Sequence, residues 1–457
     1  MKTHILSNIA LASFVALNLG GCMSGSTAAP PAQENIVKLK ADIAQIANDP
    51  AYPLASVSVA AVRDGMIVYQ GQFGNRFIDP NNAANNKPAT VDTMYRIASI
   101  SKMVTALGAL KLVEENKLNL DADISQYLGY NARNPAFPND IVTTRMLLAH
   151  TSSLRDDGGY SWDQGVGLKD VLLPGGSRYG TGTMWAKSYK PGTYFNYVNL
   201  NWTVIGSVME AASGERFDKL MHRTIMAPMG LRGGFNPAEI PAEDLANLAT
   251  LYRKRNAQEV WNIGGPWLPQ VDDYSVNKPV PRGSASYKLG DNGSLYSPAG
   301  GLRISALDLA KIMLMLINEG AYAGKEILKP QSVKNLLAQQ WRYTAGGANG
   351  DNNFGGGKEL FNAWGLGTQI FLDVSKPGAG DRVVEQGNYK AFGHLGDAYG
   401  LTSAMVFDPV TKSGMVMMTG GPGFNPDSYP GTYSAFYRYE EKILTALYKR
   451  AVLGDDK

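Results

Sequence analysis

Strand-forming segments lie at both ends of this chain and helix-forming segments lie between them, and this order constrains the fold most. Near the beginning, two β-rich runs are joined by Asp64-Gly65, which is typical of a hairpin. The strand-like runs of the two ends are 55–62, 66–69, 365–372, 401–407 and 414–419. A sheet that pairs the first and last thirds of the chain accommodates this order. The sequence therefore predicts an α+β fold: an antiparallel β-sheet flanked by helices, with an inserted, mainly helical lobe.

Apolar residues at helical spacing mark the helices of this fold. The predicted helices are 34–48, 103–115, 198–212, 215–226, 305–318 and 433–453. Three stretches without periodicity, 155–190, 261–298 and 346–357, are predicted loops, and long loops in compact domains are often functional. The predicted lobes of the globular part, 36–457, are an α/β lobe of about 36–95 and 300–457 and a helical lobe of about 96–299.

A targeting segment precedes the globular part. Lys2 is followed by the apolar run 9–19, which is too short to span a bilayer as a mature helix. The run ends in Leu-Gly-Gly-Cys22, which resembles the lipobox of bacterial lipoproteins. This resemblance implies a signal peptide, 1–21, a lipidated Cys22 and a flexible tether, 22–35. We therefore expect an exported protein anchored by lipid on the periplasmic side of a bacterial membrane; the alternative is a plain secretory signal.

Charge and composition argue against several other classes of protein. The net charge is +3, charges of both signs are interspersed, and no basic tail is present, so nucleic acid is not an expected partner. Four histidines and one cysteine are too few and too scattered to predict a metal site, and no HExxH or paired CxxC occurs. No metal or other cofactor is predicted, and the oligomeric state is left open.

Ser99 and Lys102 form the candidate nucleophile. They lie three residues apart where a buried helix is predicted to begin, so the lysine amine can reach the serine hydroxyl. A serine can be activated in this way without histidine, and the helix N-terminus favours negative charge. Roughly one or two Ser-x-x-Lys matches are expected by chance in such a chain. The second copy, Ser275 and Lys278, runs into Pro279 within a predicted loop, and we interpret it as a chance match.

Two further stretches could supply partners for this pair. Residues 194–199 contain two Tyr-x-Asn matches, in which a tyrosine could relay a proton and an amide could orient the lysine. The alternative is an aromatic helix entry packed on the core. His394 stands between glycines in 393–397, which suggests that a ligand approaches the backbone closely there. His150 and His222 are interpreted as structural, at a helix end and at an exposed helix position.

Taken together, these motifs resemble those of the serine β-lactamase and penicillin-binding-protein superfamily. The three motifs are, in chain order, Ser99-x-x-Lys102, Tyr197-x-Asn199 and His394-x-Gly396. The branch most similar in pattern contains class C β-lactamases, D-Ala-D-Ala carboxypeptidases, D-aminopeptidases and β-lactamase-fold esterases. Supporting stretches at 147–154, 191–193 and 297–302 extend the resemblance over about 54–447. It implies the same sheet-and-helical-lobe fold, with Ser99 at the seam, and gives the tyrosine role to Tyr197 rather than Tyr194.

The resemblance also implies a mechanism. Lys102, directly or through Tyr197, would remove the proton of Ser99, which attacks a carbonyl to give an acyl-enzyme that water hydrolyses. The backbone N–H groups of Ser99 and Asp397 would bind the oxyanion. The substrate-binding residues implied are Asn199, His394, Gly396 and Asp397. The substrate would be a small molecule or a short peptide.

The third motif departs from the Lys-Thr-Gly version typical of β-lactamases. His394 is mostly neutral at pH 7, and Leu395 has no hydroxyl, so a substrate carboxylate would be held less firmly. We therefore expect an ester or a D-amino-acid peptide to be the substrate. The alternatives are a weak β-lactamase and a catalytically silent sensor that binds cell-wall fragments or β-lactams. An α/β-hydrolase is disfavoured because the chain has no G-x-S-x-G motif.

Overall fold

The computed structural model describes residues 33–256, 258, 260–283, 285–353 and 357–454. The predicted signal peptide, Cys22 and most of the predicted tether lie outside the described residues. The first helix, α1 (Gln33–Ala47), includes the last three residues of that tether. Within the described residues, no helix is long and apolar enough to cross a membrane.

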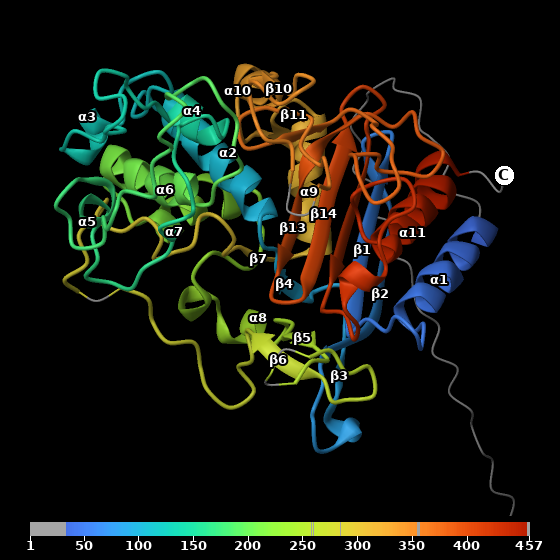
Figure 1. Cartoon of the computed structure of the whole chain (residues 1–457). Helices are drawn as coiled ribbons and strands as arrows, with labels where there is room; N and C mark the ends of the chain where they lie inside the picture. The colour runs from blue at the N-terminus through green and yellow to red at the C-terminus, as the bar shows by residue number, and fades with distance from the viewer. Residues whose placement is uncertain (1–32, 257, 259, 284, 354–356, 455–457) are drawn as a thin grey trace, which may run out of the picture.

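A nine-stranded antiparallel sheet organises the molecule, in the order β10-β11-β12-β13-β14-β15-β1-β2-β3 (Figure 1). Its strands are β1 (Ser56–Arg63), β2 (Met66–Phe77), β3 (Lys87–Pro88), β10 (Trp341–Arg342), β11 (Ala363–Trp364), β12 (Gln369–Phe371), β13 (Ala391–Ala398), β14 (Leu401–Asp408) and β15 (Ser413–Thr419). The first strand pairs with the last, with Val57 opposite Thr419. The first and last thirds of the chain therefore form one sheet, as predicted.

Helices cover both faces of this sheet (Figure 1). α1 and α11 (Arg438–Leu447) lie on one face, and α2 (Ile100–Glu114) and α9 (Ala306–Ile317) lie on the other. Alternate side chains of β1 enter two separate apolar cores: Val57 and Val59 pack on the α1 side, and Ala60 and Val62 on the other. β1 is buried on both faces, and its two buried serines, Ser56 and Ser58, satisfy their hydroxyls by hydrogen bonding with the Tyr95 hydroxyl.

The helical lobe lies beside the sheet, on the α2 side (Figure 1). Its helices are α3 (Ser125–Leu128), α4 (Thr144–Leu148), α5 (Leu168–Leu172), α6 (Leu200–Ser213) and α7 (Phe217–Met221), whereas α8 (Ala242–Leu245) lies apart from them (Figure 1). Two small antiparallel ribbons join the lobe to the sheet: β4 (Met94–Arg96) with β7 (Arg303–Ser305), and β5 (Leu251–Arg253) with β6 (Leu268–Val271). The remaining elements are β8 (Ala321–Tyr322), β9 (Lys325–Glu326) and α10 (Pro330–Leu337).

The predicted α+β fold is confirmed, but several boundaries were wrong. The predicted loop 261–298 contains β6, whose pairing with β5 leaves no local periodicity to detect. The predicted strand 365–372 shrinks to β12, because Gly365 and Gly367 form a tight turn in which the Gly365 N–H donates to Thr368 O. The predicted helix 215–226 is α7 followed by a π-helical turn.

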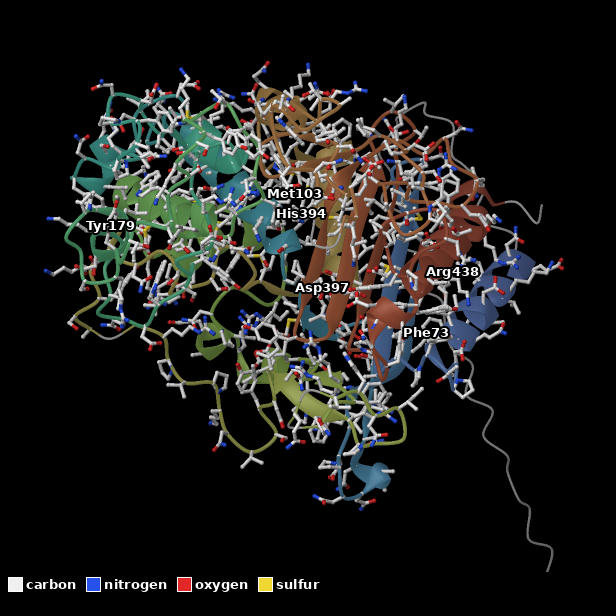
Figure 2. All side chains as sticks on the ribbon, viewed as in Figure 1. Phe73, Met103, Tyr179, His394, Asp397 and Arg438 are labelled. Carbon is white, nitrogen blue, oxygen red and sulfur yellow. The ribbon has the colours of Figure 1, made fainter. Side chains whose placement is uncertain are left out.

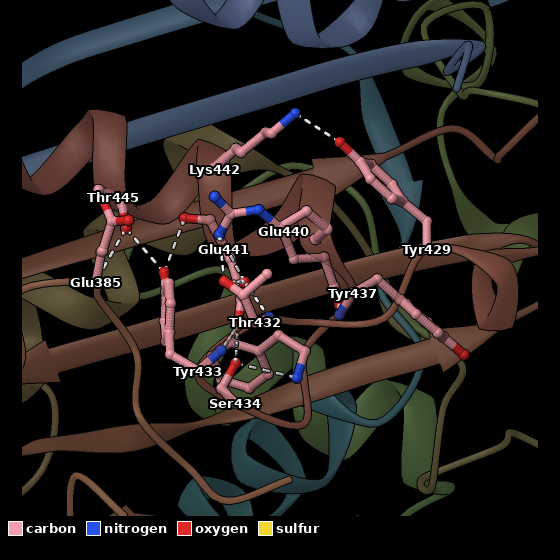
Figure 3. Close-up of polar contacts among 12 residues, drawn as sticks. Glu385, Tyr429, Thr432, Tyr433, Ser434, Tyr437, Glu440, Glu441, Lys442 and Thr445 are labelled. Atoms are coloured by element: carbon pink, nitrogen blue, oxygen red, sulfur yellow. Dashed lines mark hydrogen bonds and ion pairs between the residues drawn. The ribbon is translucent and has the colours of Figure 1, made fainter. Parts of the chain in front are cut away.

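The predicted helix 433–453 begins only at Arg438 and ends in a π-helical turn over Tyr448–Leu453. Residues 433–437 form a loop instead, because the buried Glu441 carboxylate accepts the Tyr433 N–H and the Ser434 hydroxyl (Figure 3). The Glu441 side chain, which belongs to the helix, thus forms hydrogen bonds with residues 433 and 434 that compete with an extension of the helix over them.

Candidate active site

Ser99 lies at the start of α2, immediately after the β4–β7 ribbon. The preceding residue, Ala98, has φ +48°, an uncommon conformation for a residue with a Cβ, and it turns the chain from β4 into the helix. Residues 100–110 of α2 are buried, which fixes the helix between the sheet and the helical lobe. The nucleophile therefore stands on a rigid support at the seam of the two lobes.

Lys102 is fully buried and meets three acceptors. Its Nζ lies 2.9 Å from Ser99 Oγ, 2.8 Å from Asn199 Oδ1 and 3.0 Å from the Ala299 carbonyl oxygen. Burial lowers the pKa of Lys102 to about 7, against the opposing effect of the Asp156 carboxylate. The amine is thus aimed at the serine and is partly neutral near pH 7.

Tyr197 closes the site on the other side of the lysine. The centre of its ring lies 5.1 Å from Lys102 Nζ, and the ring stacks on His150 at 4.6 Å and on Phe361 at 4.8 Å. Burial raises the pKa of Tyr197 well above its ordinary value, although a hydrogen bond with Ser99 opposes this. Tyr194, the other candidate, stacks on Tyr189 at 3.7 Å instead.

Asp156 holds Asn199 in place, and sequence reasoning missed it. Its carboxylate accepts hydrogen bonds from the backbone N–H and side-chain amide of Asn199, both at 2.9 Å, and from the N–H of Leu200 at 2.8 Å. It thereby caps α6 and turns the Asn199 carbonyl oxygen toward Lys102. Asp156 lies in an aperiodic stretch, where no spacing signal distinguishes it from Asp157.

Replacing Asp156 by Asn should therefore damage the site in two measurable ways. We expect kcat/KM to fall by about 10- to 100-fold, because one amide oxygen cannot accept all three hydrogen bonds and Asn199 loses its orientation. Removing the carboxylate should also lower the pKa of Lys102, so the rising limb of the pH–rate profile should move to lower pH. Asp157→Asn is the matched control, since Asp157 is exposed. A limb that moves to higher pH would contradict this role.

β13 supplies the third side of the site, beside α2 (Figure 2). A Cβ on Gly396 would lie 2.4 Å from Ile97 O and 3.2 Å from the Ser99 nitrogen, so only glycine lets the two backbones come this close. This close approach places the strand that carries Asp397 beside the backbone nitrogen of Ser99.

His394 is buried and neutral. Its Nδ1–H donates to the Leu395 carbonyl oxygen at 2.6 Å, and burial together with the nearby Lys102 lowers its pKa to about 3. The ring packs edge-on against Trp364 at 5.4 Å. His394 therefore brings no positive charge to the site at neutral pH.

Two cavities meet at Ser99 and Tyr197. One, of about 60 Å³, is bounded by His394, Gln369 and Phe436. The other, of about 410 Å³, is bounded by Asn199, Tyr160 and Arg96. Among the described residues, no group of three or more His, Cys, Asp or Glu side chains is placed to hold a metal ion.

The other residues considered from the sequence lie outside this site, except for His150, which packs against one of its residues. Ser275 and Lys278 are both exposed, and the Ser275 hydroxyl donates to Asp273. His222 is exposed as predicted. His150 follows α4, as predicted for a helix end, but it is also buried under Tyr197, and its Nδ1 accepts the Val198 N–H at 3.0 Å. It therefore fixes the segment that carries Tyr197 and Asn199.

Comparisons with known proteins agree with this fold. The family described as "Beta-lactamase" matches residues 39–437. A protein of Escherichia coli (strain K12) named "Putative D-alanyl-D-alanine carboxypeptidase" is 25% identical over 393 residues, which are 82% of this chain and 80% of that protein. The octameric penicillin-binding protein homologue from Pyrococcus abyssi superposes with a TM-score of 0.60 at 23% identity, covering 92% of this chain and 78% of that chain. EstCE1, a hydrolase with promiscuous acyltransferase activity, superposes with a TM-score of 0.58 at 19% identity, covering 91% and 99%.

The family match spans most of the chain, so this protein belongs to the β-lactamase family. It is a serine hydrolase of that family, whose relatives include carboxypeptidases, esterases and amidases.

Proposed function

We propose that this protein forms an acyl-enzyme on Ser99 and hydrolyses an ester or an amide, as an esterase or a D-amino-acid peptidase does. The observation that carries the proposal is the contact of 2.9 Å between Ser99 Oγ and the buried amine of Lys102, whose pKa is about 7. An amine of ordinary pKa would be fully protonated at neutral pH and could not accept the serine proton.

In the proposed reaction, the neutral amine of Lys102 takes the Ser99 proton while Oγ bonds to the substrate carbonyl carbon. The N–H groups of Ser99 and Asp397 stabilise the oxyanion. The C–O or C–N bond then breaks, and the leaving group takes a proton from Lys102, directly or through Tyr197. Water then attacks the acyl carbon and gives a proton to the amine of Lys102. The bond between the acyl carbon and Ser99 Oγ breaks, Oγ takes the proton back from Lys102, and the acid is released. Lys102 is the preferred base, because the raised pKa of Tyr197 keeps its phenol protonated.

The substrate class follows from the charges around the nucleophile. The neutral His394 supplies no fixed cation for a carboxylate on that side, so we expect β-lactam hydrolysis to be slow. The E. coli relative is named as a D-alanyl-D-alanine carboxypeptidase, which supports a peptide substrate. A silent sensor is disfavoured, because Ser99, Lys102 and Tyr197 are all present and in contact.

A fluorophosphonate probe and a labelled penicillin, each followed by mass spectrometry, test the proposal. An adduct on Ser99 with either reagent supports it, and no adduct with both refutes it. A screen of p-nitrophenyl esters, nitrocefin and D-Ala peptides, with Ser99→Ala as the blank, then identifies the substrate.

The pH dependence of the reaction should follow the ionisation of the Lys102 amine. For a neutral ester, kcat/KM should rise with pH through a midpoint of about 7 and then level off, as the amine loses its proton. Glu440 also has a pKa of about 7, so the pH profile should be measured again with Glu440→Gln. The rise of kcat/KM through pH 7 should persist in this variant, because it depends on Lys102. A rate that keeps rising to pH 10 would instead indicate a base of ordinary lysine or tyrosine pKa.

We also propose that Cys22 carries the lipid that anchors the protein to a bacterial membrane. Cys22→Ser should abolish palmitate labelling and move the protein from the membrane fraction to the soluble fraction, because the acyl chains are attached through its sulfur. Cys22 is the only cysteine in the chain, so other S-acylation cannot mask the result. Labelling that survives the substitution would refute the anchor.

A further inference from the structure

The smaller cavity beside Ser99 contains two buried atoms that meet no hydrogen-bond partner among the described residues: His394 Nε2 and Gln369 Oε1. Both side chains are almost fully buried, at 2% and 0% exposure. A buried polar atom without a partner is costly, because it has given up its hydrogen bonds to water without a replacement. The two atoms therefore point to a hydrogen-bonding molecule that enters the cavity from solution.

Both atoms are hydrogen-bond acceptors. Nδ1 of His394 faces the Leu395 carbonyl oxygen at 2.6 Å, so Nδ1 carries the proton of the neutral ring and Nε2 carries a lone pair. The side-chain nitrogen of Gln369 donates to the Leu360 carbonyl oxygen at 2.9 Å, which leaves Oε1 as the free acceptor. A molecule that satisfies both atoms must donate two hydrogen bonds.

Charged groups of both signs act on this cavity. Burial and the nearby amine of Lys102 lower the pKa of the imidazole ring, so positive charge is disfavoured there. Burial raises the pKa values of two carboxyl groups that bound the cavity, those of Asp397 and Glu440. Lys358 opposes this rise at both groups, and Arg253 opposes it at Asp397. The charges therefore favour neither a cation nor an anion, and a neutral donor fits the cavity best.

The cavity has the size and the walls that a bound water requires. Its volume of about 60 Å³ exceeds the roughly 10–15 Å³ that one water needs, and a buried water usually has about two to four polar partners. One wall, residues 435–437, is held from behind by Glu441, whose carboxylate accepts the Tyr433 N–H at 3.0 Å and the Ser434 hydroxyl at 2.8 Å (Figure 3). The cavity is therefore already formed before an acyl group is bound to Ser99.

We propose that His394 Nε2 and Gln369 Oε1 hold the water that hydrolyses the acyl-enzyme. This inference rests on the proposed acyl-enzyme chemistry and assigns Gln369 to it as a water-binding residue. Ser99 and Tyr197 bound the same cavity, so a water at the two acceptors lies beside the acyl group and beside the route of the proton. A nucleophile that is held in place reacts faster than one that must arrive from bulk water.

In this step the water oxygen bonds to the acyl carbon, and the electron pair of the carbonyl bond moves onto the oxygen in the oxyanion site. One water proton leaves His394 Nε2 and goes to the amine of Lys102, directly or through Tyr197. The other stays on the attacking oxygen, hydrogen-bonded to Gln369. The bond from the acyl carbon to Ser99 Oγ then breaks, and Oγ takes the proton from Lys102. His394 orients the water but does not take its proton, because a pKa of about 3 makes it a weaker base than Lys102, whose pKa is about 7.

The two half-reactions of p-nitrophenyl acetate test the proposal. Rapid release of p-nitrophenolate measures acylation, and loss of the acetyl group from Ser99, followed by quenching and mass spectrometry, measures deacylation. Gln369→Met fills a similar volume without the acceptor. We expect it to slow deacylation at least about tenfold more than acylation, because only deacylation consumes water. Equal slowing of the two steps would overturn the proposal.

Thr368→Val is the matched control on the neighbouring residue. The Thr368 hydroxyl oxygen is also fully buried and without a partner among the described residues, but Thr368 does not bound this cavity. The ratio of the two rates should therefore match the wild type. A ratio that changes as much as in Gln369→Met would show that the effect does not come from the cavity.

His394→Asn tests the other acceptor and decides the matter if Gln369→Met does not fold. The asparagine nitrogen can still donate to the Leu395 carbonyl oxygen, but no acceptor replaces Nε2. Deacylation should again slow at least about tenfold more than acylation. Acetyl-Ser99 that decays at the wild-type rate in this variant would contradict the assignment.

Hydroxylamine distinguishes a lost water from a distorted site. It is a stronger nucleophile than water and depends less on being held in place. In Gln369→Met and His394→Asn, the ratio of hydroxamate to acetate should therefore rise about tenfold over the wild type. An unchanged ratio would mean that both nucleophiles are slowed by distortion, and the water site would be rejected.

The same measurements separate this inference from the proposed function. An acetyl adduct on Ser99 that neither variant prolongs would leave the hydrolase and remove the water site. No adduct on Ser99 in the wild type or in either variant would refute the acyl-enzyme, and the water site with it.

Discussion

Replacing Ser99 by Ala should reduce kcat by at least about 10⁴-fold on any ester or amide that the protein turns over, because, in the described part of the chain, Ser99 Oγ is the hydroxyl that hydrogen-bonds to the amine of Lys102. The fold should survive, since the hydroxyl of Ser99 contacts the lysine and the tyrosine but no part of the apolar cores. Residual activity would come from the oxyanion donors and from substrate binding alone.

The measurement is single-turnover kinetics with an active ester, together with near-UV circular dichroism to verify the fold. Ser101→Ala offers a matched control two residues away: the Ser101 hydroxyl is buried and accepts the Leu302 N–H, outside the site. We expect it to lose stability but to keep its turnover. Turnover by Ser99→Ala within tenfold of the wild type would exclude Ser99 as the nucleophile.

Replacing Lys102 by Met should lower kcat/KM by on the order of 10³-fold. The free energy of unfolding should not decrease. Methionine fills a similar volume without a charge. A lysine pKa lowered from 10.5 to about 7 corresponds to a cost of about 5 kcal/mol for burying the charged amine. The hydrogen bonds lost to Asn199 and Ala299 offset part of this gain, at about 1 kcal/mol each.

The sign of the pH dependence makes this prediction specific. Because folding lowers the pKa of Lys102, its destabilising effect is complete below pH 7 and fades as the pH rises from 7 toward 10.5. The wild type should therefore gain stability relative to Lys102→Met between pH 7 and pH 10, as measured by urea unfolding. A variant that is several kcal/mol less stable than the wild type at pH 6 would show that the amine stabilises the fold.

Local sequence patterns predicted those elements of the fold that depend mainly on interactions between residues near one another in the chain. The hairpin at Asp64-Gly65, the helix after Ser305 and the paired end strands all follow from turn chemistry, capping or apolar patterning. β6 was missed, because a short strand is stabilised by a partner from elsewhere in the chain and needs no periodicity of its own.

The residues of the candidate site likewise fall into two groups: those that the sequence motifs predicted and those that only the structure revealed. Ser99, Lys102, Tyr197, Asn199, His394 and Gly396 are spaced as recognisable motifs, and the structure brings them together. Asp156 and the Ala299 carbonyl act through single contacts over long sequence separations, which no pattern in one sequence records. His150 looked like a helix end, and it is one; its contact with Tyr197 required the three-dimensional arrangement.

The pairing of β1 with β15 also has a consequence for biosynthesis. The ribosome synthesises β1 early, but one edge of β1 pairs with β15, residues 413–419, which are synthesised late. β13, residues 391–398, which approaches Ser99, is also synthesised late. Such distant contacts form slowly. An unfinished chain therefore carries a serine with no lowered lysine pKa and no second oxyanion donor, so reactivity arises only when synthesis and folding are nearly complete.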